Sequence, residues 1–359
     1  MEYEILILSD MCLEPSKINL EVNQIETAMR LVPGTILDAF QCAYTSDTSV
    51  MIPYAGGQES SDGTIYRFQG DKADQLLKIM HLSSEDTSRA HLHFDARMNF
   101  LAFLSREGVP VIQPLPSLKG NLYECIADQS GLWVAYAMQR VTGKTMSPKV
   151  WDPTFVQNWG RTIGKLHHVT QNYPDWRYCI DPKTNEPFLT WESEWQSFYD
   201  MCREDDIQME WQNIKVILDS LPIRRDCFGF IHNDPHLWNL RVEGSHVTLL
   251  DFDTAIHHWF INDIAIACQY ILSMHAGGFY GLVHHREFII DFLREFMIGY
   301  DQENELDHTW LHRLDTFFSY RRVLLYIIME GWRESKPDLQ RSWKEMILNH
   351  PPVLSSYDL

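Results

Sequence analysis

Residues 231–255 read IHNDPHLWNLRVEGSHVTLLDFDTA, and this stretch carries the strongest indication of both fold and chemistry. His232, Asp234 and Asn239 follow the spacing H-x-D-x-x-x-x-N, which is typical of a loop that catalyses phosphoryl transfer. Asp251 comes directly after an apolar run and is followed by Phe252. The same residue types also occur in ordinary polar loops, but this spacing together with Asp251 favours a site in which Asp234 faces an attacking hydroxyl.

The segment between the two halves of this stretch predicts a β-hairpin. Two mainly apolar runs at 240–242 and 247–250 flank the turn formers at 243–245. Such a hairpin would return the chain so that Asn239 lies beside Asp251. Mg²⁺ takes few protein oxygen ligands and fills its remaining positions with water and phosphate oxygens, so Asn239 and Asp251 are the predicted metal ligands.

Length and composition are those of a soluble protein with two lobes. The chain has 359 residues, of which 45% are hydrophobic, enough for two substantial cores. The acidic start of the sequence does not resemble a signal peptide, and no apolar run reaches the roughly 18 residues of a membrane span. The seven cysteines form no C-x-x-C pair, as expected of reduced thiols. We therefore expect a cytoplasmic protein without a membrane partner.

The formal net charge of −19 restricts the class of partner. A strongly acidic surface repels the phosphates of nucleic acids and anionic lipids, whereas it attracts cationic small molecules. Acidic surfaces also serve solubility alone, so the charge excludes nucleic-acid substrates more firmly than it identifies a ligand. We expect a small, cationic acceptor and no nucleic-acid partner.

The first third of the chain predicts a helix followed by an antiparallel sheet. A helical apolar pattern covers 22–31 and breaks at Pro33-Gly34. Strands are predicted at 64–68, 76–80, 122–126 and 132–138.

The sheet carries residues suited to nucleotide phosphates. Gly57, Ser60 and Ser61 lie in a polar turn whose backbone N–H groups would cover phosphates without a bulky side chain in the way. Lys78 is flanked by apolar residues within a strand. It is either an outward residue of a half-exposed strand or the lysine that reaches the α- and β-phosphates, and its place after a glycine-bearing hairpin favours the second.

The partner of Lys78 is open at this stage. Residues 88–104 predict a helix that ends near Gly108, which suits a C-cap. Kinase-like folds place a glutamate on this helix to pair with the lysine, yet the only acid from Ala90 to Ser105 is Asp95. Beyond the sheet, residues 139–143 read as a linker in which the carbonyl of Gln139 and the N–H of Val141 would meet an adenine edge, or as a plain connection.

The remainder of the chain is predicted to be mainly helical. Asp263 precedes an apolar helix and is predicted to be its N-cap. The predicted helices cover residues 156–168, 191–202, 209–221, 264–274, 286–300, 307–332 (possibly broken) and 339–348.

Together these motifs resemble the aminoglycoside phosphotransferase and choline kinase superfamily, small-molecule kinases with a protein-kinase-like fold. The resemblance is most specific at 232–239 and 250–255, and it extends to 56–78 and 160–167. The run DFDTA followed by HHWFINDIA is similar to a branch that includes homoserine-kinase-like enzymes and the amicoumacin kinases. It implies an α+β, bilobal fold: an N-lobe at 1–138 with a small antiparallel sheet, a linker at 139–143 and a larger helical C-lobe at 144–359.

The resemblance also implies roles for single residues. Asp234 corresponds to the catalytic aspartate, with His232 organising the loop and Asp263 bracing it from below. ATP and Mg²⁺ are the implied cofactors, with Asn239 and Asp251 as metal ligands. The implied nucleotide contacts are Lys78, Gly57, Ser60, Ser61, Met138, Gln139 and Val141, and the candidate acceptor contacts are His236, Trp238, Asp253 and Tyr320.

The expected function is ATP-dependent phosphorylation of a hydroxyl on a small amino-hydroxy metabolite or antibiotic. Two alternatives stay open: a homoserine- or choline-type metabolite kinase, and a catalytically silent nucleotide-binding protein, which the missing helix glutamate suggests. A protein kinase is disfavoured, because no Ala-Pro-Glu motif follows Asp251 and Asp263 comes only a few residues later.

Overall fold

The computed structural model describes residues 32–46, 51–54, 63–69, 74–82, 89–146, 152–276, 286–334, 336–349, 352 and 354. The chain divides into two compact units, which are described separately. The first consists of Met1–Ala102 and Ile112–Val141, and the second of Phe103–Val111 and Thr142–Leu359.

The first unit is built on an antiparallel sheet in the order β1-β2-β3-β6-β4, with β5 also paired to β6. The strands are β1 (Ile52–Pro53), β2 (Thr64–Gln69), β3 (Asp74–Leu82), β4 (Pro114–Leu115), β5 (Glu124–Asp128) and β6 (Gly131–Gln139). The predicted strands are confirmed in place and direction. In the register, Lys78 of β3 stands opposite Ile65 of β2 and Tyr136 of β6.

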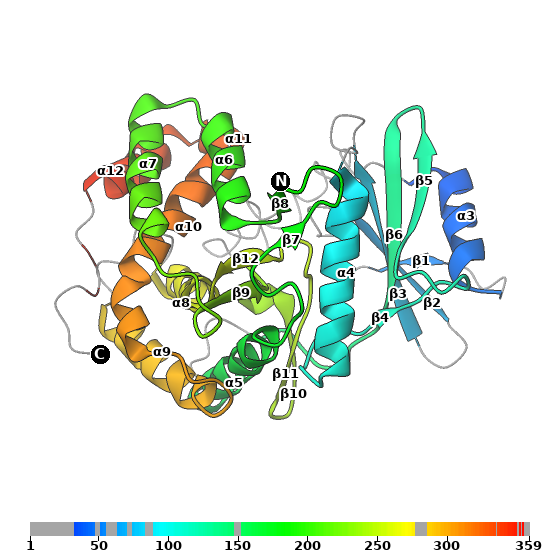
Figure 1. Ribbon diagram of the computed structural model, residues 1–359, viewed down its shortest axis with the longest axis horizontal. Helices are drawn as coiled ribbons and strands as arrows, with labels where there is room; N and C mark the ends of the chain where they lie inside the picture. Colours follow the sequence, from blue (N-terminus) through cyan, green and yellow to red (C-terminus); the bar gives the residue numbers. More distant parts are fainter. Residues whose placement is uncertain are drawn as a thin grey trace. The chain divides into compact units, whose positions relative to one another are not determined.

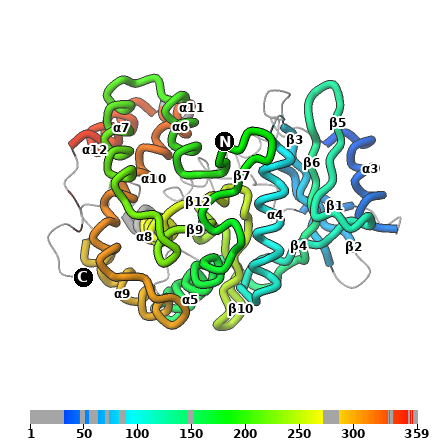
Figure 2. Tube along the Cα trace, in the orientation of Figure 1, coloured from blue at the N-terminus to red at the C-terminus, as the bar shows by residue number. Residues whose placement is uncertain are grey.

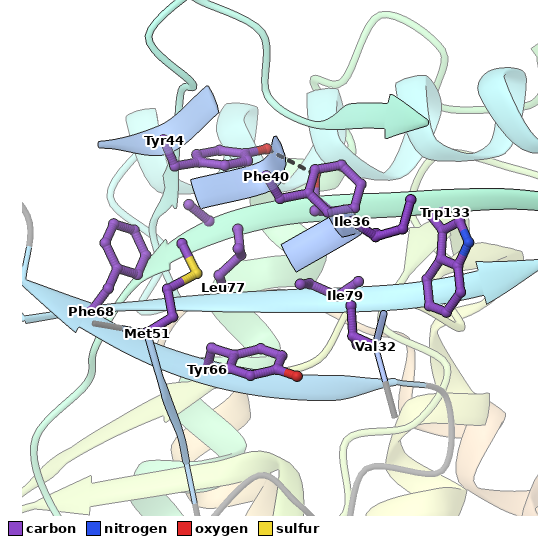
Figure 3. Packing of buried hydrophobic residues seen from close by; sticks show 12 residues of the cluster. Val32, Ile36, Phe40, Tyr44, Met51, Tyr66, Phe68, Leu77, Ile79 and Trp133 are labelled. Atoms are coloured by element: carbon purple, nitrogen blue, oxygen red, sulfur yellow. Dashed lines mark hydrogen bonds between the residues drawn. The ribbon is translucent and has the colours of Figure 1, made fainter. Parts of the chain in front are cut away.

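Two helices cover opposite faces of this sheet, α3 (Gly34–Tyr44) and α4 (Ala90–Arg106) (Figure 1). Apolar side chains of α3 and of one sheet face form the core drawn in Figure 3, in which the Tyr44 hydroxyl donates to the carbonyl of Ala135 at 2.8 Å. Leu77 and Ile79 belong to this core. Since side chains alternate along a strand, Lys78 lies on the other face, where it is 2% exposed.

The predicted helix at 22–31 lies outside the described residues. The structure shows that a helix, α3, begins at Gly34 with Pro33 as its N-cap residue, where the sequence predicted a break. Proline lacks an N–H and is therefore tolerated where a helix starts, so the pair marks an opening. The helix end near Gly108 is confirmed, with this glycine at a φ of 75°.

The second unit is mainly helical (Figures 1 and 2). Its helices are α5 (Pro153–Thr170), α6 (Trp191–Met201), α7 (Asp205–Asp219), α8 (Phe260–Ala276), α9 (Arg286–Tyr300), α10 (Leu314–Ile328), α11 (Glu330–Glu334) and α12 (Pro337–Asn349), with short 3-10 turns η3 (Leu237–Asn239) and η5 (His308–Arg313). Its strand pairs are β7 (Cys179–Ile180) with β8 (Pro187–Phe188), β9 (Phe228–Ile231) with β12 (Ile256–Trp259), and β10 (Leu240–Glu243) with β11 (His246–Leu249). The predicted helices are confirmed, and the region predicted at 307–332 is indeed broken.

Helices α5 and α9 cross backbone to backbone. A Cβ added at Gly160 would overlap the Phe296 carbonyl, and one added at Gly164 would lie 2.5 Å from the Tyr300 carbonyl oxygen. From the other side, a Cβ at Gly299 would overlap the carbonyl of Gln157. Glycine at these positions therefore sets how closely the two helices approach. Figure 2 shows α5 and α9 next to each other in the second unit.

We expect Gly299→Ala to lower the free energy of unfolding by about 1–3 kcal/mol, because the added methyl group must push two backbones apart. Urea unfolding followed by tryptophan fluorescence measures the change. Gly331→Ala is the matched control, since a Cβ at this helical position meets nothing within 4 Å. Equal stability of the two variants would show that the crossing tolerates a side chain.

Candidate active site

The predicted hairpin is confirmed and brings the two halves of the motif together. Strands β10 and β11 pair in the register Leu240 to Leu249 and Glu243 to His246. At its open end, the N–H of Leu250 donates to the carbonyl of Asn239 at 2.8 Å. Asp251 therefore directly follows a residue that is hydrogen-bonded to Asn239. The hairpin could be predicted from the sequence because its two strands are neighbours in the chain and pair across a short turn.

His232 joins the loop that carries Asp234 to the same hairpin. Its Nε2 lies 2.8 Å from the carbonyl oxygen of Leu250, and its Nδ1 lies 3.3 Å from the backbone nitrogen of Asp234. The carbonyl can only accept and the backbone N–H can only donate, so Nε2 carries the proton and Nδ1 accepts. The ring is fully buried against Phe252. These contacts use both ring nitrogens, which supports a loop-organising role.

Asp263 holds the loop from below and does not cap a helix. Helix α8 begins at Phe260, so Asp263 lies within its first turn, and the predicted N-cap role was wrong. Its carboxylate accepts the N–H of His232 at 3.1 Å and the N–H of Asn233 at 2.8 Å. Asn233 has a φ of 65°, in the left-handed region where asparagine is among the better-tolerated residues. Two hydrogen bonds to the buried carboxylate of Asp263 therefore hold the backbone at His232 and Asn233 in this conformation.

A buried polar chain continues from Asp263 through α5 and α9. His167 Nε2 lies 3.2 Å from the Asp263 carboxylate, and His167 Nδ1 lies 2.8 Å from the Tyr300 hydroxyl. Burial lowers the pKa of His167, although Asp263 opposes the shift. A neutral ring that donates from Nε2 and accepts at Nδ1 satisfies both neighbours. The Tyr300 oxygen also accepts from Asn304 at 2.8 Å.

Both carboxylate oxygens of Asp234 are in polar contact, and the side chain is only 7% exposed. Oδ1 accepts from Nη2 of Arg321 at 2.6 Å. Oδ2 lies 3.2 Å from Nε2 of His236 and 3.2 Å from Nδ2 of Asn239. Burial alone would raise the pKa of Asp234, but the charges of His236 and Arg321 outweigh it and hold this pKa well below its ordinary value. The carboxylate is therefore ionised at neutral pH.

Glu194 of α6 links the loop to α10. One of its oxygens accepts from Nδ2 of Asn233 at 2.8 Å, and the other accepts from the Tyr320 hydroxyl at 2.7 Å. Tyr320 was a candidate for stacking on an acceptor ring, but it is 1% exposed and packs against Trp211, so that prediction is corrected. Asn233 and Arg321 were not predicted as site residues, and Glu194 was only one of several acidic residues of the C-terminal helices that could face an acceptor. The sequence does not reveal these contacts, because Glu194 and Arg321 lie far along the chain from the residues they meet.

The remaining candidates of this unit differ in exposure. Trp238 is 37% exposed and stays a candidate for acceptor contact. His236 is buried, stacks on Tyr270 and contacts Asp234. Asp253 is half-buried two residues after Asp251, which has a φ of 56°.

The nucleotide candidates belong to the first unit. Lys78 is buried in β3, and Met138 is buried in β6. Gln139 is the last residue of β6, and its N–H donates a hydrogen bond to the carbonyl of Gln113. Val141 follows outside the strand. Asp95, considered as a partner of Lys78, accepts from the Tyr123 hydroxyl at 2.9 Å. Gly57, Ser60 and Ser61 lie outside the described residues.

The chain belongs to the phosphotransferase enzyme family, whose family model matches residues 53–304. It is similar to the amicoumacin kinase of Bacillus subtilis (strain 168), with 28% identity over 276 residues that cover 74% of this chain and 76% of the relative. The predicted family and the prediction that the chain is a phosphotransferase are thereby confirmed.

Solved structures confirm the protein-kinase-like α+β fold. The amicoumacin kinase hAmiN in complex with AMP-PNP, Ca²⁺ and Ami has a TM-score of 0.74 at 22% identity and covers 94% of this chain and 98% of its own. A microcompartment-associated aminopropanol kinase has a TM-score of 0.60 at 20% identity, with 87% and 93% covered. Among the described residues, no helix is both long and apolar enough to cross a membrane.

We expect Asp263→Ala to lower the free energy of unfolding by about 2–4 kcal/mol, because two buried N–H groups lose their acceptor. Urea unfolding provides the measurement. The control is Asp291→Ala, which removes an exposed ion pair with Arg294 and should change stability by less than about 0.5 kcal/mol. A loss no larger than in this control would contradict the bracing role of Asp263.

Proposed function

We propose that this protein transfers the γ-phosphoryl group of ATP to a hydroxyl of a small amino-hydroxy compound. The observation that carries the proposal is the joint placement of Asp234 and Asn239 on one loop, hydrogen-bonded to the strand end that bears Asp251. An ionised carboxylate, an amide and a second carboxylate at this spacing are the parts that phosphoryl transfer requires.

Asp234 is the proposed catalytic residue. Its carboxylate orients the acceptor hydroxyl and takes up the hydroxyl proton as the new oxygen–phosphorus bond forms, while the bond from the γ-phosphorus to the bridging oxygen breaks and ADP leaves. His232 and Asp263 keep the loop in place through the contacts described above. Catalysis in this site rests on positioning and on charge, because phosphoryl transfer demands little covalent chemistry from the protein.

Asn239 and Asp251 are the proposed ligands of Mg²⁺. Both offer the hard oxygen atoms that this ion prefers, and Mg²⁺ keeps several waters or phosphate oxygens in its shell. When bound, the ion would neutralise charge on the phosphates.

The nucleotide is proposed to bind through residues of the first unit. Lys78 supplies a positive charge from the sheet face opposite the α3 core, which suits contact with the α- and β-phosphates. The backbone of Gln139 and Val141, with Met138 beside them, supplies the adenine contacts. We also propose that the backbone N–H groups of Gly57, Ser60 and Ser61 cover the phosphates.

The acceptor is proposed to carry an amino group. The net charge of −19 favours a cationic ligand, and the relatives named above are kinases of amicoumacin and of aminopropanol. A kinase of this kind that acts on an antibiotic would confer resistance to it. His236, Trp238 and Asp253 stay proposed acceptor contacts. The described cysteines are all free thiols, which supports the cytoplasm as the compartment.

Two alternative functions are weaker. A metabolite kinase would use the same site. The aminopropanol kinase among the similar structures supports a small amino alcohol as an alternative class of acceptor. A catalytically silent nucleotide-binding protein would not need the three groups Asp234, Asn239 and Asp251, which this chain carries at the spacing of the catalytic motif.

We expect Asp234→Asn to lower phosphate transfer by about 100-fold or more while ATP binding persists, since the amide cannot accept the hydroxyl proton. Mass gain of one phosphate, screened over amino-hydroxy antibiotics and amino alcohols, measures transfer, and calorimetry measures ATP binding. Asp219→Asn, which alters an exposed ion pair with Lys215, is the control. Transfer by Asp234→Asn at the wild-type rate would show that another group is the base.

We expect Asp251→Asn to raise the Mg²⁺ concentration required for half-maximal transfer by roughly tenfold or more, because a neutral amide is a weaker ligand than a carboxylate. A Mg²⁺ titration at fixed ATP gives the shift. Asp226→Asn removes an exposed carboxylate beside Arg224 and should leave the titration unchanged. An unshifted midpoint in Asp251→Asn would remove this residue from the metal site.

A further inference from the structure

The segment that follows β6 is fastened to the sheet by its backbone. Gln139, the last residue of β6, stands opposite Gln75 of β3. The next N–H group, that of Arg140, donates to the carbonyl of Asp74 at 3.2 Å. Asp74 is the first residue of β3, the strand that carries Lys78. The start of the linker is therefore aligned with the strand that bears the proposed phosphate contact.

The side chain of Arg140 extends this connection to two more segments of the sheet. Its Nη1 donates to Oδ2 of Asp74 at 3.4 Å, and the same oxygen accepts from Nη2 of Arg67 in β2 at 2.6 Å. Arg140 also forms a hydrogen bond with the side chain of Tyr54. Tyr54 directly follows β1, and its own N–H donates to the carbonyl of Ile65 in β2 at 2.9 Å. One guanidinium thus joins the linker to β1, β2 and β3.

The geometry of the guanidinium suits this task. Side chains of Arg140 and Asp74 are 35% and 29% exposed, and a single ion pair of this kind contributes little to overall stability. A guanidinium, however, offers several N–H donors in one rigid plane, so it can meet a carboxylate and a hydroxyl at the same time. Two partners from different strands restrict the position of Arg140, and with it the backbone on either side.

We propose that Arg140 is a positioning residue for nucleotide binding. Through Asp74 and Tyr54 it keeps the backbone of the linker in one place relative to β3. The adenine contacts proposed for Gln139 and Val141 are then ordered before the nucleotide arrives. The inference rests on the proposed function and deepens it, because it assigns a role in ATP affinity to a residue that need not touch ATP.

The physical reason is the entropy of ordering. A protein segment that becomes ordered only when the ligand binds lowers the affinity, whereas a segment that is ordered beforehand does not. Without its side chain, Arg140 would keep the backbone hydrogen bond to Asp74 but lose the contacts to the Asp74 carboxylate and to Tyr54. The linker would then sample more positions, and the adenine would have to order it. Phosphate contacts made by Lys78 would be unaffected.

The test compares ATP with tripolyphosphate, which carries the phosphates without the base. In Arg140→Met we expect the dissociation constant for ATP, measured by calorimetry with Mg²⁺, to rise by about five- to tenfold, and that for tripolyphosphate to change by less than about twofold. Arg140→Lys keeps the charge without the planar group and should restore part of the ATP affinity.

Arg67→Met is the matched control. It removes a cation from the same oxygen of Asp74 but leaves the linker contacts of Arg140 in place, so it should bind ATP as wild type does. Asp74→Asn should weaken ATP binding in the same direction as Arg140→Met. The double variant should then lose less than the sum of the two single losses, because both changes remove the same contact.

Three results would overturn the proposal. ATP affinity unchanged in Arg140→Met would show that the linker keeps its position without the guanidinium. An equal loss of tripolyphosphate affinity, or an equal loss of ATP affinity in Arg67→Met, would show a general effect of charge or of damage to the fold. Failure of the wild-type protein to bind ATP would instead refute the proposed function.

Discussion

The carboxylate of Asp263 is the group on which the candidate site depends. It lies fully buried in the first turn of α8 and receives the N–H groups of His232 and Asn233. A buried carboxylate is tolerated only when donors surround it, and here the donors are the backbone of the loop and the ring of His167. The loop must therefore adopt the conformation that presents those N–H groups. Asp234 is the next residue in the chain, so the conformation of the loop sets the orientation of its side chain.

Much of this architecture could be predicted from the sequence because the signals are local. The β10–β11 hairpin follows from a turn of favourable residues between two apolar runs, and the helices follow from apolar residues at helical spacing. Strands β9 and β12 gave no such signal. Each has four residues that are all buried, so the alternation that marks a half-exposed strand is missing. Their pairing depends on a distant partner.

Contacts between distant segments account for what could not be predicted at the site. Arg321 and Glu194 look like ordinary polar residues of amphipathic helices, and only tertiary packing brings them to Asp234 and Asn233. Asp263 was misplaced by a few residues because the helix begins within a buried apolar stretch at Phe260. The net charge of −19 also did not predict that a cation, the guanidinium of Arg321, lies beside Asp234.

The close crossing of α5 and α9 has a consequence for how this unit can change. Gly164 precedes His167 by one helical turn, and Gly299 directly precedes Tyr300, whose hydroxyl meets the His167 ring. The glycine contacts thus fix how α5 and α9 are aligned along their axes. This alignment also fixes the positions of the His167 and Tyr300 rings next to Asp263. A residue inserted into either helix between the crossing and its ring would rotate that ring by about 100° away from its neighbour. Chimeras of related proteins should therefore exchange α5 and α9 together.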